Sequence, residues 1–197
     1  MKIVLATRNR KKVEELQRAA LGRSLELVTL DAYPDCPDVV EDGQTFRENA
    51  IKKAVAVARF TGCAALADDS GLEVEALAGR PGVHSARYAR VGATDSENVA
   101  RLLEELAGVE ESARQARFVC VLAMAGPDGR VEIFEGTVSG RIGYTVTGTN
   151  GFGYDPVFFP EGEKRTFAEM EGREKDAMSH RGRALASWVA ALDRWLV

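Results

Sequence analysis

A cluster of basic and polar residues lies at the start of a predicted helix, directly after a short apolar strand predicted at residues 2–6. The cluster consists of Thr7, Arg8, Asn9, Arg10, Lys11 and Lys12. Cations are disfavoured at the amino end of a helix, which carries a partial positive charge, unless an anion lies among them. Backbone N–H groups together with arginine and lysine side chains would suit a polyphosphate. A solvated basic turn is the alternative, and this segment alone does not separate the two.

Two adjacent carboxylates, Asp68 and Asp69, follow a second apolar strand predicted at residues 64–67, and Glu41 and Asp42 lie in an earlier loop. Carboxylates near a phosphate would repel it unless a divalent cation lies between them, and hard oxygen ligands suit Mg²⁺. The alternative is an aspartate-rich turn, which a lone Asp-Gly pair would indicate. Two adjacent carboxylates after a buried strand favour the functional interpretation.

One lysine faces the apolar side of a predicted helix. Lys53 and Asn49 project from the same side as an apolar stripe at helical spacing, which consists of Phe46, Ala50, Ala54, Val57 and Phe60. A cation that faces inward needs an anionic partner, such as a phosphate or a catalytic carboxylate. The alternative is a lysine that extends to the edge of the helix. Because burying a cation costs desolvation, we expect the removal of Lys53 to raise stability in the absence of substrate.

Glycines and aromatic residues alternate in a loop predicted at residues 148–156. Its three glycines permit close backbone approach, and Phe152 and Tyr154 could offer a flat surface to a base. An ordinary loop with one buried aromatic residue is the alternative. Cations gather again around the start of the last predicted helix, at Lys175, His180 and Arg181.

Alternating strands and helices position these segments, a pattern typical of α/β proteins. Strands are predicted at residues 2–6, 25–30, 64–67, 72–77, 118–125, 131–138 and 157–159. Helices are predicted at residues 10–21, 45–60 and 94–106, with a last helix capped by Ser179 and running to about Trp195. Two helices begin with the capping boxes Thr45-Phe-Arg-Glu48 and Thr94-Asp-Ser-Glu97. A turn sequence at residues 127–130 joins two of the strands into a hairpin, so we expect a mixed sheet.

The composition fits one globular domain spanning residues 1–197, with 45% hydrophobic and 28% charged residues. The net charge of −4 disfavours a nucleic-acid partner, because proteins that bind nucleic acid non-specifically are normally basic. No apolar run approaches the roughly 18 residues of a membrane span, so we expect no membrane partner. The three cysteines form no Cys-x-x-Cys pair, which predicts reduced thiols in a cytoplasmic protein.

Taken in order, these motifs resemble those of the inosine/xanthosine triphosphate pyrophosphatase family. The matching stretches are residues 6–12, 45–50 with Lys53, 67–71, 81–82, 85–88, 115–118, 151–156 and 179–182. They span almost the whole chain, and their joint order is highly specific. The family usually has a small residue, often glycine, at the position of Arg8.

The resemblance implies an elongated mixed β-sheet flanked by helices, two lobes with a substrate cleft between them, and a homodimer. It also implies hydrolysis of a non-canonical purine nucleoside triphosphate between the α and β phosphates. The products would be a nucleoside monophosphate and pyrophosphate. Two other interpretations stay open: a nucleic-acid-binding protein without catalysis, and a pyrophosphatase that prefers modified pyrimidine nucleotides.

Carried onto this sequence, the resemblance makes Asp69 the base and a metal ligand, Glu41 a second ligand of Mg²⁺, and Lys53 a support for the phosphates. Residues 7–12 would hold the triphosphate, and Ser70 would contact the substrate. The nucleotide and its base would be held by Phe152, Gly153, Tyr154, Asp155, Lys175, His180 and Arg181. Donors from His180, Arg181 or the loop backbone could meet O6 of a 6-oxo purine, where adenine presents a donor of its own.

Overall fold

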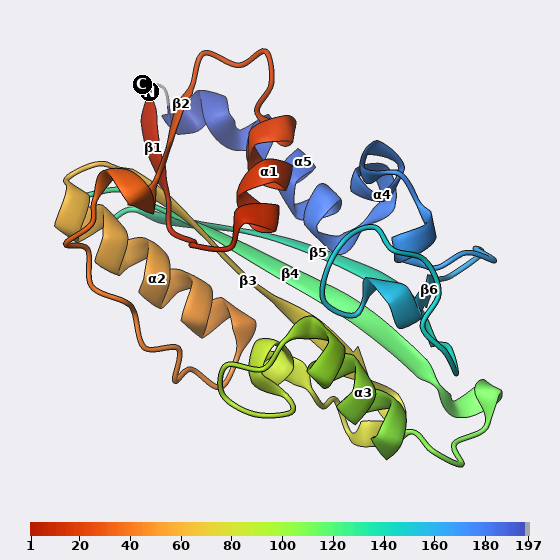
Figure 1. The fold of residues 1–197 in the computed structure, drawn as a ribbon. Coiled ribbons are helices and arrows are strands. Elements are labelled where there is room, and N and C mark those ends of the chain that lie inside the picture. The colour runs from red at the N-terminus through yellow and green to blue at the C-terminus, as the bar shows by residue number, and fades with distance from the viewer. Residues whose placement is uncertain (196–197) are drawn as a thin grey trace. The chain divides into compact units, whose positions relative to one another are not determined.

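The structure is a computed structural model that describes residues 1–195 (Figure 1). Six strands form one sheet in the order β2-β1-β3-β4-β5-β6. They are β1 (Lys2–Leu5), β2 (Glu26–Thr29), β3 (Ala64–Val74), β4 (Gln115–Ala125), β5 (Val131–Ile142) and β6 (Phe158–Pro160). β1 pairs in parallel with β2 and β3, whereas β5 pairs antiparallel to β6. The predicted mixed sheet of an α/β protein is therefore confirmed.

The α-helices of the described chain are α1 (Arg10–Ala19), α2 (Phe46–Thr61), α3 (Asp95–Glu105), α4 (Gly172–Met178) and α5 (His180–Ala191). The sequence predicted all of them except the short α4. The last predicted helix ends early, because α5 gives way to a 3₁₀ turn at Leu192–Trp195. None of the helices among residues 1–195 is both long enough and apolar enough to cross a bilayer.

The chain divides into two compact units, each built from segments that are distant in sequence. The first unit contains Met1–Asp69, Cys120–Gly136 and, within the described chain, residues 181–195. The second unit contains Ser70–Val119 and Thr137–His180. The expected single domain and the expected cleft between two lobes stay predictions.

The core of the first unit lies between its strands and the helices α1 and α5. Ile3 and Leu5 alternate with Val4 along β1, and they pack with Leu16 of α1 and Trp188 of α5. The opposite face of β1 is covered by α2 (Figure 1). Both faces of this parallel part of the sheet are therefore buried, as the apolar sequence of residues 2–6 predicted.

The core of the second unit is rich in aromatic side chains. Phe118 of β4 packs against Phe158 of β6, with 4.6 Å between the ring centroids. Phe167 stacks on the Phe158 ring at 5.3 Å. Leu102 of α3 and Leu72 of β3 belong to the same cluster. This core joins the loop at residues 148–156 to the last part of β3.

One strand is longer than the sequence predicted. β3 continues from Ala64 through Asp68 and Asp69 to Val74, so the predicted end of the strand at residue 67 and the separate strand at residues 72–77 are wrong. Aspartate is normally depleted in strands. Here cations lie beside both carboxylates, and the strand continues because its charges are compensated.

Two local predictions for α2 also need correction. Glu48 N–H donates to Thr45 Oγ1 at 3.1 Å, as in a capping box. The Glu48 carboxylate, however, accepts from the N–H of Gln44 rather than from that of Thr45. Phe60, which was placed on the inner stripe, is 47% exposed because it lies in the last turn of the helix. The box at Thr94 is complete.

A buried arginine ties together three segments of the second unit. Arg114 is 2% exposed, and its guanidinium donates to the carbonyl oxygens of Leu106, Ile142 and Gly143, each at 2.8 Å. It also lies 4.4 Å from the centroid of the Tyr144 ring. The end of α3 and the end of β5 are therefore held by one side chain, which the sequence analysis did not single out.

We predict that Arg114→Lys lowers the free energy of unfolding by about 2–4 kcal/mol, because one ammonium cannot reproduce the planar fork of donors. Urea denaturation measures the change. Arg101→Lys is the control, since the Arg101 side chain is 49% exposed and pairs with Glu104 and Glu105 on its own helix, and the substitution should change the free energy of unfolding by less than about 1 kcal/mol. Equal effects of the two substitutions would contradict this role for Arg114.

Candidate active site

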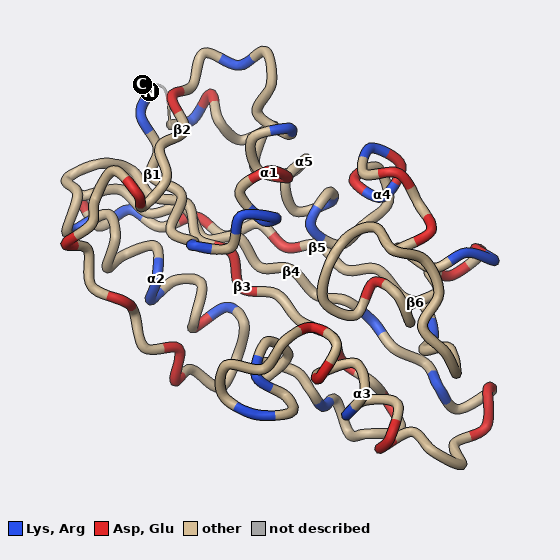
Figure 2. Tube along the Cα trace, viewed as in Figure 1, with Lys and Arg blue, Asp and Glu red and all other residues tan. Residues whose placement is uncertain are grey.

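The candidate site of the first unit is centred on two adjacent aspartates in β3. Figure 2 shows acidic positions in the middle of β3 and basic positions at the start of α1. Successive side chains of a strand point to opposite faces of the sheet, so Asp68 and Asp69 have different neighbours. Asp69 lies beside α2, and Asp68 lies beside α1 and α5. The two carboxylates therefore form two distinct clusters.

The first cluster joins Asp69, Lys53 and Glu41. Lys53 Nζ lies 3.1 Å from Asp69 Oδ1 and 3.1 Å from Glu41 Oε1. It also donates to the backbone oxygen of Asp68 at 2.9 Å. Lys53 is 9% exposed, so the alternative of a lysine extending to the helix edge is wrong.

A buried asparagine holds the loop that carries Glu41. The N–H of Gly43 donates to Asn49 Oδ1 at 2.8 Å, and Asn49 is 1% exposed. A Cβ atom at position 43 would lie 2.6 Å from that oxygen, so only glycine fits without a shift. Glu41, two residues before Gly43, is thereby kept beside Lys53.

Burial and charge act against each other in this cluster. Burial raises the pKa of Asp69 above its usual value, although Lys53 and Lys12 act in the opposite direction. Burial alone would lower the pKa of Lys53, but Asp69, Glu41 and Asp68 together raise it. A carboxyl with a raised pKa is a better proton acceptor when ionised than an ordinary aspartate, which suits a general base.

The same cluster offers ligands for a divalent cation. Asp69 Oδ2 is buried and has no hydrogen-bond partner among residues 1–195. The Glu41 carboxylate pairs with Lys53, as Asp69 Oδ1 does. Those residues contain no group of three or more potential metal-ligating side chains. Mg²⁺ is usually bound through one or two carboxylates with substrate phosphates and water completing the shell. The two carboxylates fit such an ion.

The second cluster surrounds Asp68, whose side chain is fully buried. Lys12 Nζ donates to Asp68 Oδ1. Arg181 Nε donates to Asp68 Oδ2 at 2.7 Å, and Arg181 Nη1 donates to Glu15 Oε2 at 2.7 Å. Burial alone would raise the pKa of Asp68, but Arg181 and Lys12 hold it well below its usual value. Asp68 is therefore a permanent anion that binds two cations.

Of the six residues in the predicted basic cluster, Lys12 is the one that contacts these carboxylates in the described structure. Asn9 caps α1, because its side chain accepts from the N–H groups of Lys11 and Lys12. Thr7 Oγ1 accepts from the N–H of Asn9 at 3.2 Å. Arg8 instead bonds to the neighbouring loop, with its Nε 3.0 Å from Asp38 Oδ1. Arg10 is exposed.

A third cluster lies in the second unit, on the loop before β6. Lys175 Nζ donates to Asp155 Oδ2 at 2.5 Å, and both side chains are buried. The same ammonium lies 4.7 Å from the centroid of the Phe152 ring. The N–H of Phe152 donates to Asp155 Oδ2 at 2.9 Å. Because a Cβ atom at Gly151 would lie 2.1 Å from that oxygen, glycine is required there.

The other predicted residues of the second unit are also fixed by contacts. The N–H of Gly153 donates to Asp95 Oδ2 at 2.7 Å, and Tyr154 donates its hydroxyl to the backbone oxygen of Ser85 at 2.8 Å. His180 stacks on the Phe118 ring, with 4.6 Å between centroids. Ser70 is half-buried in β3. The loop is thus fixed by its contacts, and Phe152 in it is half-buried.

Sequence reasoning missed Glu15 and the positioning contact of Asn49. Glu15 lies three residues after Lys12 on α1, so both point to one face of the helix, and this spacing was a usable signal. Asn49 was noticed on the inner side of α2, but its partner Gly43 could not be inferred.

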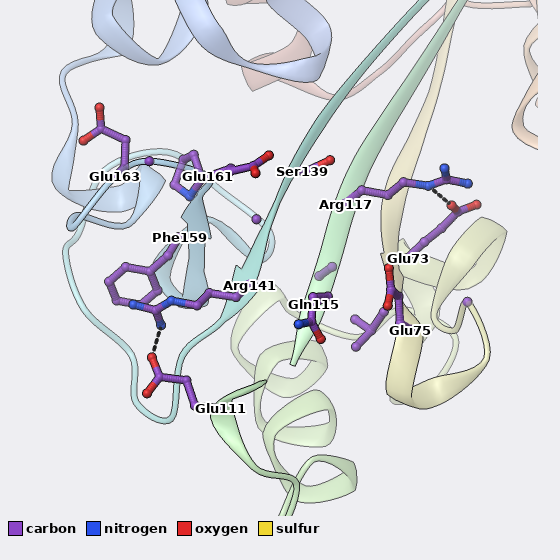
Figure 3. A pocket seen from close by; sticks show the side chains of 16 residues that line it. Glu73, Glu75, Glu111, Gln115, Arg117, Ser139, Arg141, Phe159, Glu161 and Glu163 are labelled. Carbon is purple, nitrogen blue, oxygen red and sulfur yellow. Dashed lines mark hydrogen bonds and ion pairs between the residues drawn. The ribbon is translucent and has the colours of Figure 1, made fainter. Parts of the chain in front are cut away.

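The second unit also has an open pocket of about 830 Å³ (Figure 3). Among the side chains that line it, Arg117 pairs with Glu73, and Arg141 pairs with Glu111 while lying over the Phe159 ring. None of the catalytic, substrate-binding or metal-binding residues predicted from sequence lines this pocket. Both arginines that line it are already paired with carboxylates, and we assign no chemistry to the pocket.

Comparison with known proteins identifies the family. The Ham1 family matches residues 3–191 of this sequence. The chain belongs to the Ham1 family. Its fold agrees with a Ham1 protein of known structure from Coxiella burnetii, with a TM-score of 0.91 and 41% identity over 98% of this chain and 99% of that one.

Relatives within the family have an assigned activity. The chain is 50% identical to a dITP/XTP pyrophosphatase of Streptomyces avermitilis over 190 residues, which is 95% of each protein. It is 49% identical to a dITP/XTP pyrophosphatase of Desulforamulus reducens over 194 residues, covering 98% of this chain and 96% of the relative. The predicted family resemblance is confirmed.

The ion pairs of Lys53 lead us to predict the opposite of the stability change expected from sequence. Its pKa is raised, so the stabilisation is fully present below the usual value of 10.5 and is lost only as pH rises through the higher folded-state value. We predict that Lys53→Met lowers the free energy of unfolding at pH 7 by about 3 kcal/mol, because two carboxylates lose their cation.

Adding Asp69→Asn to Lys53→Met should restore part of this loss, since one uncompensated charge is then removed. Urea denaturation of the single and double variants measures both effects. Lys52→Met is the matched control, because Lys52 pairs with Asp42 at the surface. This substitution should change the free energy of unfolding by less than about 1 kcal/mol. A Lys53→Met variant as stable as the parent would show that the desolvation cost of burying Lys53 equals the stabilisation from its ion pairs.

Proposed function

We propose that this chain hydrolyses the triphosphates of deaminated purine nucleosides, dITP, ITP and XTP, to the monophosphate and pyrophosphate. The observation that carries the proposal is the near 50% identity to dITP/XTP pyrophosphatases over nearly the full length of both chains. The three clusters of charged and aromatic side chains support it, because each offers chemistry that this reaction requires.

The cluster of Asp69, Lys53 and Glu41 performs the hydrolysis. A water molecule transfers a proton to the Asp69 carboxylate while its oxygen bonds to the α phosphorus. The bond from that phosphorus to the oxygen bridging the α and β phosphates breaks, and pyrophosphate leaves with the electron pair. Mg²⁺, held by Glu41 and Asp69, would neutralise charge on the phosphate oxygens. Lys53 keeps both carboxylates in place and offsets negative charge that builds up on the phosphates.

The basic cluster at residues 7–12 binds the triphosphate. Lys12 is its central member, because its ammonium is held by Asp68 and is only partly exposed. A contact to phosphate cannot distinguish one base from another, since every nucleoside triphosphate carries the same phosphates. Lys12 therefore contributes to catalysis on all substrates alike.

The loop of the second unit recognises the base. Phe152 offers its ring, and Asp155 with Lys175 holds the loop backbone. Ser70, Gly153, Tyr154 and His180 complete the substrate contacts that we propose. Arg181 stays a predicted base contact, with its Nε and Nη1 donors bound to Asp68 and Glu15. The homodimer and the cytoplasmic location, without a nucleic-acid or membrane partner, are also part of this proposal.

Asp69→Asn should lower the rate of pyrophosphate release from dITP and XTP by at least about 100-fold, because the amide cannot accept the proton of water. The fold should be retained, as judged by circular dichroism and thermal unfolding. Asp42→Asn is the control, because Asp42 is an exposed carboxylate in the neighbouring loop, and its turnover should match that of the parent. Parental turnover in a folded Asp69→Asn protein would rule out Asp69 as the base.

Base recognition is tested best at His180, because removing the Arg181 guanidinium would also break its bonds to two buried carboxylates, Asp68 and Glu15. His180→Phe keeps a ring stacked on Phe118 and deletes the nitrogen atoms. We predict that the dITP-to-dATP ratio of kcat/KM falls by roughly 5- to 100-fold, the cost of leaving O6 without its donor. Lys12→Met should lower both reactions by similar factors.

The measurement is steady-state turnover of dITP, XTP, dGTP, dATP and dUTP by each variant. An unchanged ratio in His180→Phe would assign base recognition to the loop backbone or to Arg181. Preferential turnover of dUTP by the parent protein would contradict the purine specificity.

A further inference from the structure

We propose that Glu15 is a positioning residue that acts through Arg181 and Asp68 to fix the place of the Lys12 ammonium. This inference rests on the proposed function, in which Lys12 binds the triphosphate. It concerns a carboxylate that neither the sequence motifs nor the proposed mechanism uses.

A continuous series of ion pairs connects Glu15 to Lys12. Glu15 is 7% exposed and binds Arg181 Nη1 at 2.7 Å. Arg181 Nε in turn binds Asp68 Oδ2 at 2.7 Å, and the other oxygen of Asp68 binds Lys12 Nζ. The two oxygens of Asp68 therefore serve two different cations, and the position of one affects the other.

Buried donors fix one oxygen atom of the Asp68 carboxylate, Oδ2. Cys120 Sγ donates to Asp68 Oδ2 at 3.3 Å, beside the bond from Arg181 Nε. Two donors on Oδ2 limit rotation of the carboxylate, so Oδ1 is held toward Lys12. The Lys12 side chain is 16% exposed, whereas those of Arg181 and Asp68 are 3% and 0% exposed. The series thus ends at the member that can reach a ligand.

The charges of Glu15, Arg181, Asp68 and Lys12 sum to zero. If Glu15 lost its charge, Arg181 would interact more strongly with Asp68, and the net positive charge would repel Lys12 from the pair. The Lys12 ammonium would then be released from its position, while attraction for phosphate would not decrease. A loss of Glu15 charge should therefore lower kcat without raising KM. A smaller folded fraction would also lower kcat, but it would do so equally in the presence and absence of the Lys12 ammonium.

Glu15→Gln tests this, because glutamine keeps the shape and can still accept from Arg181. We expect kcat for dITP to fall roughly 10- to 100-fold, the range expected for a misplaced catalytic group, with no rise in KM. In a Lys12→Met background the same substitution should change kcat by no more than about twofold, because the group it positions is absent. Glu14→Gln, at the exposed neighbouring position, should leave the kinetics unchanged.

A second measurement does not depend on turnover. Acetic anhydride labels free amines, and mass spectrometry compares labelling of Lys12 with that of the exposed Lys11. Release of Lys12 from Asp68 in Glu15→Gln should increase its labelling several-fold relative to Lys11. If the parent protein hydrolyses none of the triphosphates but this labelling still increases, the proposed function fails and the positioning role stands.

Three results would overturn the inference. The first is unchanged kcat together with unchanged Lys12 labelling in Glu15→Gln. The second is an equal loss of kcat in the parental and Lys12→Met backgrounds, which would mean that Glu15 acts through another group. The third applies if Glu15→Gln does not fold. Cys120→Ala then removes the second donor to Asp68 Oδ2, and unchanged Lys12 labelling in that variant would overturn the inference.

Discussion

The arrangement of the first unit depends on charge compensation on both faces of one buried strand. Two aspartates stand side by side in β3, a position that would be unfavourable without cations. Lys53 from α2 compensates Asp69, and Arg181 from α5 with Lys12 from α1 compensates Asp68. Each of the three helices therefore contributes a charge as well as an apolar face. The strand, the helices and the site are held in place by the same contacts.

The two aspartates differ because their surroundings differ. Asp68 lies between strong donors and keeps its negative charge, whereas Asp69 has an oxygen atom that no described residue binds. Neighbouring titratable groups with opposite shifts are typical of sites that divide chemical roles. One aspartate organises cations, and the other is available for a proton or a metal ion. This division is a property of the alternation of side chains along a strand.

Much of this could be predicted from local sequence, and the remainder depends on contacts between distant residues. The inward position of Lys53 follows from helical spacing alone, and the hairpin follows from its turn residues. The continuation of β3 through Asp68 and Asp69 could not be predicted, because the compensating cations come from positions 12, 53 and 181. Glu15 was overlooked for the same reason, since its partner Arg181 is 166 residues away along the chain. The short α4 carries too few residues for a periodic signal.

The first unit takes its segments from both ends of the sequence, and this affects the way in which the protein can be made. Trp188 and Leu185 of α5 fill the core beside Ile3 and Leu5 of β1. A ribosome synthesises these positions almost a full chain length apart. Until α5 is synthesised, β1 and α1 therefore keep an apolar face exposed to solvent or to a chaperone. The core of this unit closes only after α5 has left the exit tunnel.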